Sequence, residues 1–347
     1  MWPPWRQGRQ RGQGLLAIVA ELRLIAGFDA GQTHTTCRLS DADGAAVLAE
    51  GQGPGVCHLA APAGPARFRQ ALQESWTLAC SQLAAAGTAP PPARLLAAAI
   101  GASGIEVGAP VQVAGRELAA QALGLPLPLV VVTGDERTAL RGAMGNHRGG
   151  IVVISGTGMI AVGRNPAGLE HRCGGWGWLL DGAGSAMDIG RDGLALSLEM
   201  ADGRRSDSPL RARVWAGLNV HPDDPHAAQV IKARVVEPDF GAAGFARLAP
   251  LVVAAASEGD AAAAAVVERS ALALARMVLT ISRRLDLEAP PVWPMGGALE
   301  HLHLLRARLA AALEHSCPGA QLRSPAGDAC NGALALARDC LAASAAD

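Results

Sequence analysis

Three glycine-containing turns in this sequence carry residue types suited to binding phosphate. The first, GFDAGQTHT at residues 27–35, places Asp29 at the end of an apolar segment and follows it with Gly31 and Thr33. A carboxylate at the end of a buried strand is costly to desolvate unless it holds a cation, directly or through water. Gly31 lets a backbone amide approach a phosphate, and Thr33 adds a hydroxyl donor. The alternative is an Asp-Gly hairpin turn with no ligand.

The other two turns also follow apolar strands. Residues 155–158 (SGTG) come directly after IVVI, and their amides can form an anion-binding concavity without any lysine. Residues 295–298 (MGGA) lie between an expected strand and an expected helix, where glycines allow a flat ring or a ribose to lie against the main chain. A glycine pair after a strand is common in ordinary turns. The order and spacing of all three turns favour a nucleotide site.

The composition excludes several other nucleotide-binding and nucleic-acid-binding classes. The 347-residue chain contains one lysine, Lys232, which lies in VIKARVV. A Walker A loop requires Gly-Lys-Ser/Thr and a protein kinase requires a lysine on a strand, so neither class fits. With a net charge of -1 and a pI near 6.8, the chain lacks the basic surface of a nucleic-acid-binding protein. Its seven cysteines form no C-x-x-C pair and no zinc-type cluster, which is typical of reduced cytosolic thiols.

Strand-like and helix-like patterns alternate from residue 24 to residue 162, as in an α/β fold with a mainly parallel sheet. The expected strands are 24–28, 45–50, 95–100, 129–133, 151–154, 160–162, 292–295 and 321–323. The expected helices are 68–83, 116–123, 136–145, 183–200, 244–257, 261–285 and 328–341. The segments GFDAGQTHT and VISGTGMIAVG both predict a strand, a tight turn and a second strand. Two similar lobes facing a cleft are therefore expected, with a boundary between residues 124 and 134.

The first 23 residues differ from the rest of the chain. A basic, turn-rich segment precedes an apolar run that Glu21 and Arg23 interrupt. A secretory signal needs an uncharged apolar core before its cleavage site, so we expect residues 1–23 to be a disordered extension or the product of an upstream start codon. No other run of roughly 18 uncharged apolar residues occurs, so we expect a cytoplasmic protein without a membrane span.

Five motifs spread over residues 24–341 resemble those of one family. The sequence is similar to the BadF/BadG/BcrA/BcrD group of the actin-like ATPase (sugar kinase/Hsc70) superfamily, and most similar to its N-acetylglucosamine kinases. The motifs are GFDAGQTHT, VVISGTGMIAVG, CGGWGWLLDGAGSA, VWPMGGALE and PAGDACNGALALA. The resemblance implies an α/β fold with two ribonuclease-H-like lobes around a central cleft that binds ATP and Mg²⁺. It assigns residues 24–130 and the C-terminal helix 328–347 to one lobe, and residues 131–327, with helical insertions, to the other.

The same resemblance implies a role for particular residues. Asp135 would be the catalytic base, and Asp29 would hold Mg²⁺ through water. The residues implied around ATP are Gly31, Thr33, Gly156, Thr157, Gly158, Gly296 and Gly297. The residues implied around the sugar are Asp135, Gly175, Trp176, Gly177 and Asp181. The implied activity is ATP-dependent phosphorylation of an amino sugar, first of all N-acetylglucosamine at its 6-hydroxyl. The implied partner is a small sugar rather than nucleic acid or membrane, with a homodimer as a possible assembly.

Alternatives remain open for individual residues and for the function. Asp135 could instead be a helix N-cap, Trp176 a core side chain, and Glu106 a second candidate base. Relatives carry glycines where this chain has Ala30 and Gln32, an asparagine at Cys57 and an aspartate at Gly182. Since amides and carboxylates that bind hydroxyls set sugar selectivity, these departures affect the substrate more than the fold. The alternative functions are a non-catalytic nucleotide or sugar sensor and, with less support, an ATPase activator of 2-hydroxyacyl-CoA dehydratases.

Overall fold

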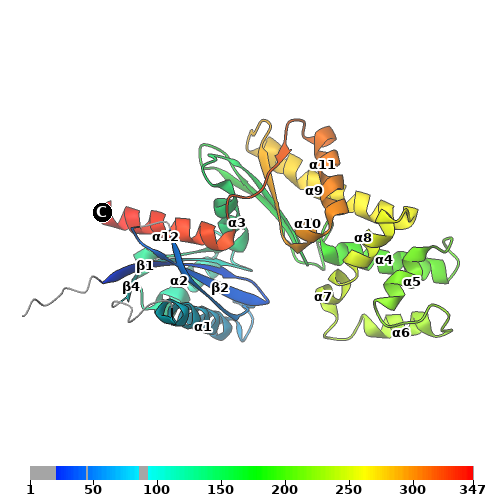
Figure 1. The fold of residues 1–347 in the computed structure, drawn as a ribbon, viewed down its shortest axis with the longest axis horizontal. Coiled ribbons are helices and arrows are strands. Elements are labelled where there is room, and N and C mark those ends of the chain that lie inside the picture. Colours follow the sequence, from blue (N-terminus) through cyan, green and yellow to red (C-terminus); the bar gives the residue numbers. More distant parts are fainter. Residues whose placement is uncertain (1–20, 44–45, 86–92, 347) are drawn as a thin grey trace, which may run out of the picture.

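The chain folds into two lobes that lie side by side, as Figure 1 shows. The structure is a computed structural model that describes residues 21–43, 46–85 and 93–346. Each lobe contains one five-stranded sheet with helices packed against it, which confirms the expected α/β class. The first 20 residues lie outside the described part, and the first strand begins at Leu22, inside the expected extension of residues 1–23.

The first sheet has the strand order β3-β2-β1-β4-β5. Its strands are β1 (Leu22–Ala30), β2 (His34–Asp41), β3 (Val47–Pro54), β4 (Ala93–Ala102) and β5 (Val130–Gly134). Three helices and a short 3₁₀ turn accompany it: α1 (Gly64–Ala85), α2 (Pro110–Leu123), η1 (Leu127–Leu129) and α12 (Ala329–Ala346). Phe28 and Ile100 belong to the core that includes residues of α1 and α2, whereas Ile25 packs in the core that contains Leu334 of α12. Because helices cover both faces, β1 is an almost continuous apolar run.

The second sheet has the strand order β10-β9-β6-β7-β8. Its strands are β6 (Gly150–Ser155), β7 (Met159–Arg164), β8 (Glu170–Gly174), β9 (Pro291–Met295) and β10 (Gln321–Leu322). The helices of this lobe are α4 (Ala186–Ala201), α5 (Pro209–Ala216), α6 (Ala227–Arg234), α7 (Gly241–Ala246), α8 (Ala249–Ser257), α9 (Ala261–Arg284), α10 (Gly297–His301) and α11 (His303–Ser316). The long helix α9 starts at an N-cap, Asp260, whose side chain accepts a hydrogen bond from the amide of Ala263 at 3.0 Å.

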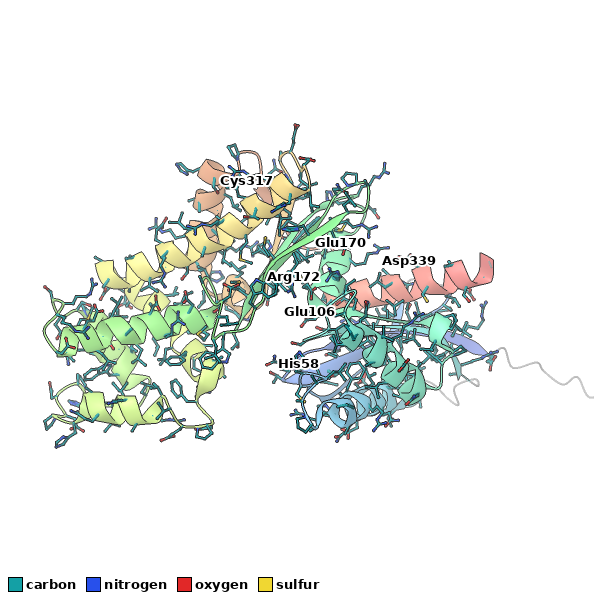
Figure 2. The ribbon with its side chains drawn as sticks, turned by 180° about the vertical axis from the view of Figure 1, so that it is seen from behind. His58, Glu106, Glu170, Arg172, Cys317 and Asp339 are labelled. Carbon is teal, nitrogen blue, oxygen red and sulfur yellow. The ribbon has the colours of Figure 1, made fainter. Side chains whose placement is uncertain are left out.

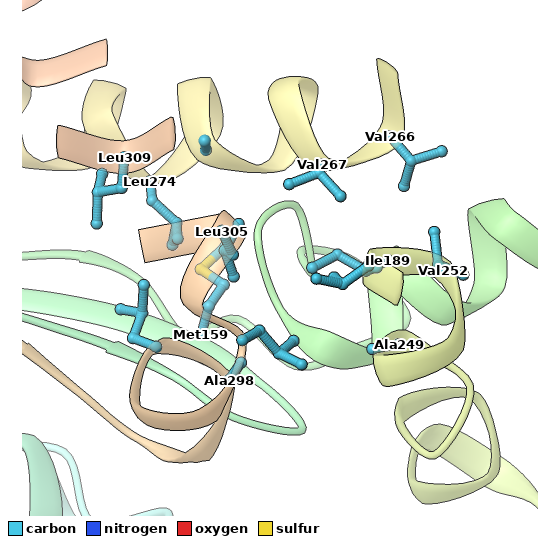
Figure 3. Packing of buried hydrophobic residues seen from close by; sticks show 14 of the residues in the cluster. Met159, Ile189, Ala249, Val252, Val266, Val267, Leu274, Ala298, Leu305 and Leu309 are labelled. Carbon is cyan, nitrogen blue, oxygen red and sulfur yellow. The ribbon is translucent and has the colours of Figure 1, made fainter. Parts of the chain in front are cut away.

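The core of the second lobe lies between its sheet and α9, as Figure 3 shows from close by. Met159 of β7 and Ile189 of α4 belong to one buried cluster with Leu274 of α9 and Leu305 of α11. Burial of side chains of this size supplies most of the favourable free energy of folding. The cluster holds the ends of β6 and β9, and the turns that follow them, on a rigid support.

Helix α3 (Asp135–Met144) leads the chain from the first sheet to the second and crosses α12. The crossing is close because two glycines meet there. A Cβ atom on Gly142 would lie 1.9 Å from the carbonyl oxygen of Asp328, and one on Gly332 would lie 1.9 Å from that of Thr138. No side chain fits at either position. The crossing therefore fixes the first residue of α3, Asp135, relative to Asp328 just before α12.

The structure corrects several details of the sequence prediction. Both sheets are mixed rather than mainly parallel, because β2 and β8 pair antiparallel with their neighbours, and β8 was not among the expected strands. The expected strand–turn–strand repeat is confirmed, as β1–β2 and β6–β7. The predicted helix 244–257 is two helices, with Pro250 in the first turn of the second. The expected residue bounds of the two lobes stay a prediction, and the expected boundary at residue 130 falls in β5, which pairs with β4 of the first sheet. In the described part of the chain, no helix is long and apolar enough to cross a membrane.

Candidate active site

The turn between β1 and β2 presents main-chain groups beyond the end of a buried strand. Asp29 lies near the end of β1, and Figure 1 shows this blue strand running toward the second lobe. The turn is closed by a hydrogen bond from the amide of Gly31 to the carbonyl of His34 at 3.1 Å. A Cβ atom on Gly31 would meet one atom, that carbonyl oxygen, at 3.4 Å, and Thr33 is exposed. The outer side of the turn is therefore open to a ligand.

Ala30 and Gln32, which stand where the family pattern has glycines, do not block the open side of this turn. Ala30 is fully buried in the first-lobe core, so its methyl group points away from the face on which Asp29 lies. Gln32 is exposed, and its main chain packs against Gly55, where a Cβ atom would lie 2.1 Å from the Gln32 carbonyl oxygen. The departures from the family pattern thus leave the main chain of the turn accessible.

The turns after β6 and β9 lie next to each other at one edge of the second sheet. The parallel pairing of Ile154 with Met295 brings them together. No atom lies within 4 Å of a Cβ built on Gly156 or Gly158, and Thr157 between them is exposed. An open, glycine-rich turn of this kind can receive an anion on its amides.

At position 296 the backbone itself requires glycine. Its φ of +87° is in the left-handed region, and a Cβ atom there would lie 2.6 Å from the carbonyl oxygen of Ser155. Glycine is therefore needed for the two turns to approach each other. Gly297 begins α10 and is exposed, so the surface over this turn is accessible to a flat ring.

Asp135 is the first residue of α3, and it shares a sheet edge with Asp29. The pairings of Ala30 with Ala102 and of Ala102 with Gly134 align the ends of β1, β4 and β5. The N-cap residue of α3 is Gly134, which has no side-chain cap, so the helix N-cap role considered for Asp135 is wrong. Its carboxylate accepts a hydrogen bond from the adjacent amide of Glu136 at 3.0 Å. Burial, followed by the negative charges of Glu136 and Asp29, raises the pKa of Asp135 to about 7.

The carboxylate of Asp29 lies in a region of negative charge. Burial raises its pKa, as does the nearby charge of Asp328, whereas His34 and Arg38 act in the opposite direction. Arg38 binds both oxygens of Asp328, at 2.7 and 2.8 Å. Although burial opposes it, this bond keeps the pKa of Asp328 below its ordinary value. None of the described residues affects the pKa of Asp29 through a hydrogen bond. Its carboxylate oxygens are therefore free for a cation or water.

The loop after β8 owes its shape to glycines and leaves an aromatic side chain exposed. Gly174, Gly175 and Gly177 have φ values of +73°, +77° and +89°. Trp176 between them is 61% exposed, so it is not a core side chain, and the guanidinium of Arg172 lies 4.7 Å from its ring centroid. The loop is thus a preformed surface with an aromatic ring available for a ligand.

The positions that the family resemblance assigns to sugar hydroxyls differ from the expected pattern in shape as well as in residue type. Gly182 is buried, and a Cβ atom there would lie 2.4 Å from the end of the Met187 side chain. Asp181 is partly buried, and burial followed by the charge of Asp188 raises its pKa. Cys57 is half-buried in the segment after β3. The structure thus provides a carboxylate near this loop but no amide at position 57.

Sequence reasoning missed a chain of charged residues beside Asp135. Glu136 is buried, and its carboxylate accepts a hydrogen bond from Arg137 at 2.6 Å. Arg137 also donates to Glu170 of β8 at 2.9 Å, so these ion pairs connect α3 with the second sheet. The signal was present as the charged triplet DER directly after the strand VVVTG. A cavity of about 760 Å³ between α4 and α9 contains none of the predicted site residues.

Two mixed sheets, joined by crossing helices and bearing glycine turns at their strand ends, define the actin-like ATPase and sugar kinase fold. The chain belongs to the BadF/BadG/BcrA/BcrD ATPase family, whose model matches residues 26–337.

Curated relatives of this chain are sugar kinases. An N-acetylmuramic acid/N-acetylglucosamine kinase of Clostridium acetobutylicum is 27% identical over 211 residues, covering 60% of this chain and 67% of the relative. An N-acetyl-D-glucosamine kinase of Dictyostelium discoideum is 28% identical over 191 residues, covering 54% of this chain and 59% of the relative. The chain thus matches 59% to 67% of the length of these proteins.

Solved structures share the whole fold. A candidate N-acetylglucosamine kinase of Chromobacterium violaceum is 29% identical, with a TM-score of 0.66 over 91% of this chain and 99% of that one. A ROK family glucokinase of Streptomyces griseus, solved with glucose and AMPPNP, is 18% identical, with a TM-score of 0.55 over 91% and 99% of the two chains. The second likeness concerns the fold alone.

Proposed function

We propose that this protein is an ATP-dependent kinase that phosphorylates an amino sugar, with N-acetylglucosamine and its 6-hydroxyl as the first candidate. The observation that carries the proposal is the pair of carboxylates, Asp29 and Asp135, at one edge of the first sheet. Neither forms an ion pair with a described residue, and burial raises the pKa of both. Perturbed carboxylates in such a position are typical of catalytic sites. The two curated kinases support an amino sugar as the acceptor.

In the proposed reaction Asp135 is the general base. Its carboxylate accepts the proton of the sugar hydroxyl while the hydroxyl oxygen forms a bond to the γ-phosphorus of ATP. The bond from that phosphorus to the bridging oxygen of the β-phosphate breaks, and ADP leaves with the electron pair. A base with a pKa of about 7 is well matched to neutral conditions, because it is ionised in about half of the molecules and has a high proton affinity.

The phosphate groups would be held by main-chain amides and hydroxyls from both lobes. Gly31 and Thr33 would contribute from the first lobe and residues 156–158 from the second, with Gly296 and Gly297 beside the adenosine. Asp29 fits the role of a Mg²⁺ residue because its carboxylate is partly buried and forms no ion pair with a described residue. Within the described residues no group of three or more ligating side chains converges, which suits an ion that keeps several waters. When bound, Mg²⁺ would neutralise charge on the phosphates.

A coupled assay of ADP release tests this function. The acceptors are N-acetylglucosamine, glucosamine, N-acetylmuramic acid and glucose, each with wild type and with Asp135→Asn. We expect turnover of at least one amino sugar and a loss of about 10²- to 10⁴-fold in the variant. Asp223→Asn is the matched control, because its side chain is 87% exposed in a loop of the second lobe. Equal activity of Asp135→Asn and wild type would exclude Asp135 as the base.

A sensor that binds nucleotide or sugar without turnover is the second candidate. Cys57 and Gly182 favour it, because neither side chain offers the strong hydrogen bonds with which a kinase orients a sugar hydroxyl. Calorimetry distinguishes the two functions: tight binding of nucleotide or sugar, together with no turnover of any acceptor, would support the sensor.

A further inference from the structure

Arg172 projects from the second lobe toward the end of the first sheet that carries Asp135. It lies on β8 two residues after Glu170, so the two side chains share one face of the strand. On this face Glu170 contacts Arg137 of α3, and the guanidinium of Arg172 lies 3.5 Å from the carboxylate of Glu106, in the loop after β4. Figure 2 shows Glu106, Glu170 and Arg172 together at the junction of the lobes.

The guanidinium of Arg172 is held in place, but few of its N–H groups have a hydrogen-bond acceptor among the described residues. Its side chain is 20% exposed and lies against the ring of Trp176, in the loop expected to receive the sugar. Of its five N–H groups, one has an acceptor among the described residues, and that single contact is long, at 3.5 Å. By comparison, Arg38 makes four hydrogen bonds to side chains, all at 2.7 or 2.8 Å. Arg172 therefore has donors available for a ligand.

A stacked arginine with free donors is suited to a carboxylate. The planar guanidinium offers two parallel N–H groups to the two oxygens of such a group, and the aromatic ring fixes its plane. The hydroxyl-binding positions at Cys57 and Gly182 lack an amide and a carboxylate, so a neutral sugar has fewer partners here. A ligand carboxylate would replace the long contact to Glu106 with a stronger one.

We infer that Arg172 is a specificity-determining residue that binds a carboxylate of the acceptor, so that the preferred substrate is an amino sugar with an acidic substituent. This inference rests on the proposed kinase function and specifies its substrate class: it ranks an acidic amino sugar above N-acetylglucosamine, the first candidate of the proposed function. In the protein without substrate, the carboxylate of Glu106 is the acceptor for Arg172, and the carboxylate of an acidic acceptor sugar replaces it on binding.

The test compares an acidic acceptor with neutral ones. N-acetylmuramic acid, its methyl amide and N-acetylglucosamine are assayed with wild type, Arg172→Gln, Arg172→Lys and Glu106→Gln. We expect wild type to prefer the acid over the methyl amide, mainly through KM. Arg172→Gln should reduce that preference about 10- to 100-fold, and Arg172→Lys should reduce it less, because a charge remains without the planar fork. Glu106→Gln should increase the preference. Arg276→Gln, on an exposed position of α9, is the control.

Two results would overturn the inference: equal use of the acid and its methyl amide by wild type, or an unchanged preference in Arg172→Gln. A melting curve confirms that each variant is folded. If wild type phosphorylates no amino sugar, the proposed function fails on its own, and calorimetry of the same sugars then decides the role of Arg172. Tighter binding of the acid that is lost in Arg172→Gln supports the inference, and equal binding of acid and amide overturns it.

Discussion

Replacing Asp135 with asparagine should reduce activity and increase the stability of the folded protein at the same time. The carboxylate is buried beside Glu136 and Asp29, which together with burial raises its pKa from 3.8 to about 7. A difference of this size corresponds to at most about 4 kcal/mol of free energy that disfavours the charged form in the folded state. Asparagine has nearly the same shape and no charge, so the substitution removes this unfavourable free energy.

The sign and the pH range follow from proton binding. Between about pH 4 and pH 7 the folded protein binds a proton at Asp135 more tightly than the unfolded chain does. The stability from this group is fully present below pH 3.8 and is lost as the pH rises through 7. The advantage of Asp135→Asn should therefore be greatest at pH 8 and fall by roughly 1.4 kcal/mol for each pH unit below 7.

Urea unfolding of both proteins at pH 5, 6, 7 and 8, without nucleotide, measures this advantage. Asp223→Asn serves as the control, because its exposed carboxylate has no comparable burial. A constant difference between Asp135→Asn and wild type across this range would refute the assignment of a buried, partly protonated carboxylate. A variant that is less stable than wild type at pH 8 would refute it as well.

Three further substitutions follow from the geometry. Glu136→Gln removes the negative charge beside Asp135, so the pKa of Asp135 should fall and the rise of kcat/KM with pH should move to lower pH; an unchanged profile would contradict the coupling. Gly296→Ala places a methyl group 2.6 Å from a main-chain oxygen at a φ of +87°, and we expect a higher KM for ATP and a loss of about 1–3 kcal/mol in unfolding free energy. Gly142→Ala forces α3 and α12 apart and should destabilise the protein by about 2–4 kcal/mol in urea. Gly203→Ala is the control for both, with φ +82° and no atom near its Cβ; losses as large there would show that the clashes are not the cause.

The sequence predicted those elements whose pattern is local. Buried strands such as β1 and β4 are apolar on both faces, and α9 repeats its apolar stripe over many turns, so their positions follow from periodicity. The turns after β1, β6 and β9 were predictable for a similar reason, since a glycine or threonine after an apolar run marks the end of a buried strand. The strand β2 was expected only as the second strand of the GFDAGQTHT repeat, and its length was not predicted, because HTTCRLSD mixes polar and apolar residues in a way that is also typical of a loop.

The candidate site depends more on tertiary structure. Asp29 and Asp135 are 106 positions apart in the sequence, and the aligned ends of β1, β4 and β5 place them at one edge. The role of Glu136 also required the structure, because its neighbours show that it is buried and paired with Arg137. For Trp176 the sequence left a core position open beside the expected sugar-binding role, and the structure excludes the core position, because three left-handed glycines hold the side chain on the surface.

The sequence by itself determined the family, the α/β class and the glycine-containing turns, because these depend on residues close together in the chain. Tertiary structure decided the electrostatic properties of the site. Charge, burial and approach act through space, so the pKa of Asp135 and the free donors of Arg172 depend on residues from distant segments. The glycines at positions 142 and 332 illustrate the same division: the sequence contains them, but the crossing of α3 and α12 shows why no larger residue fits.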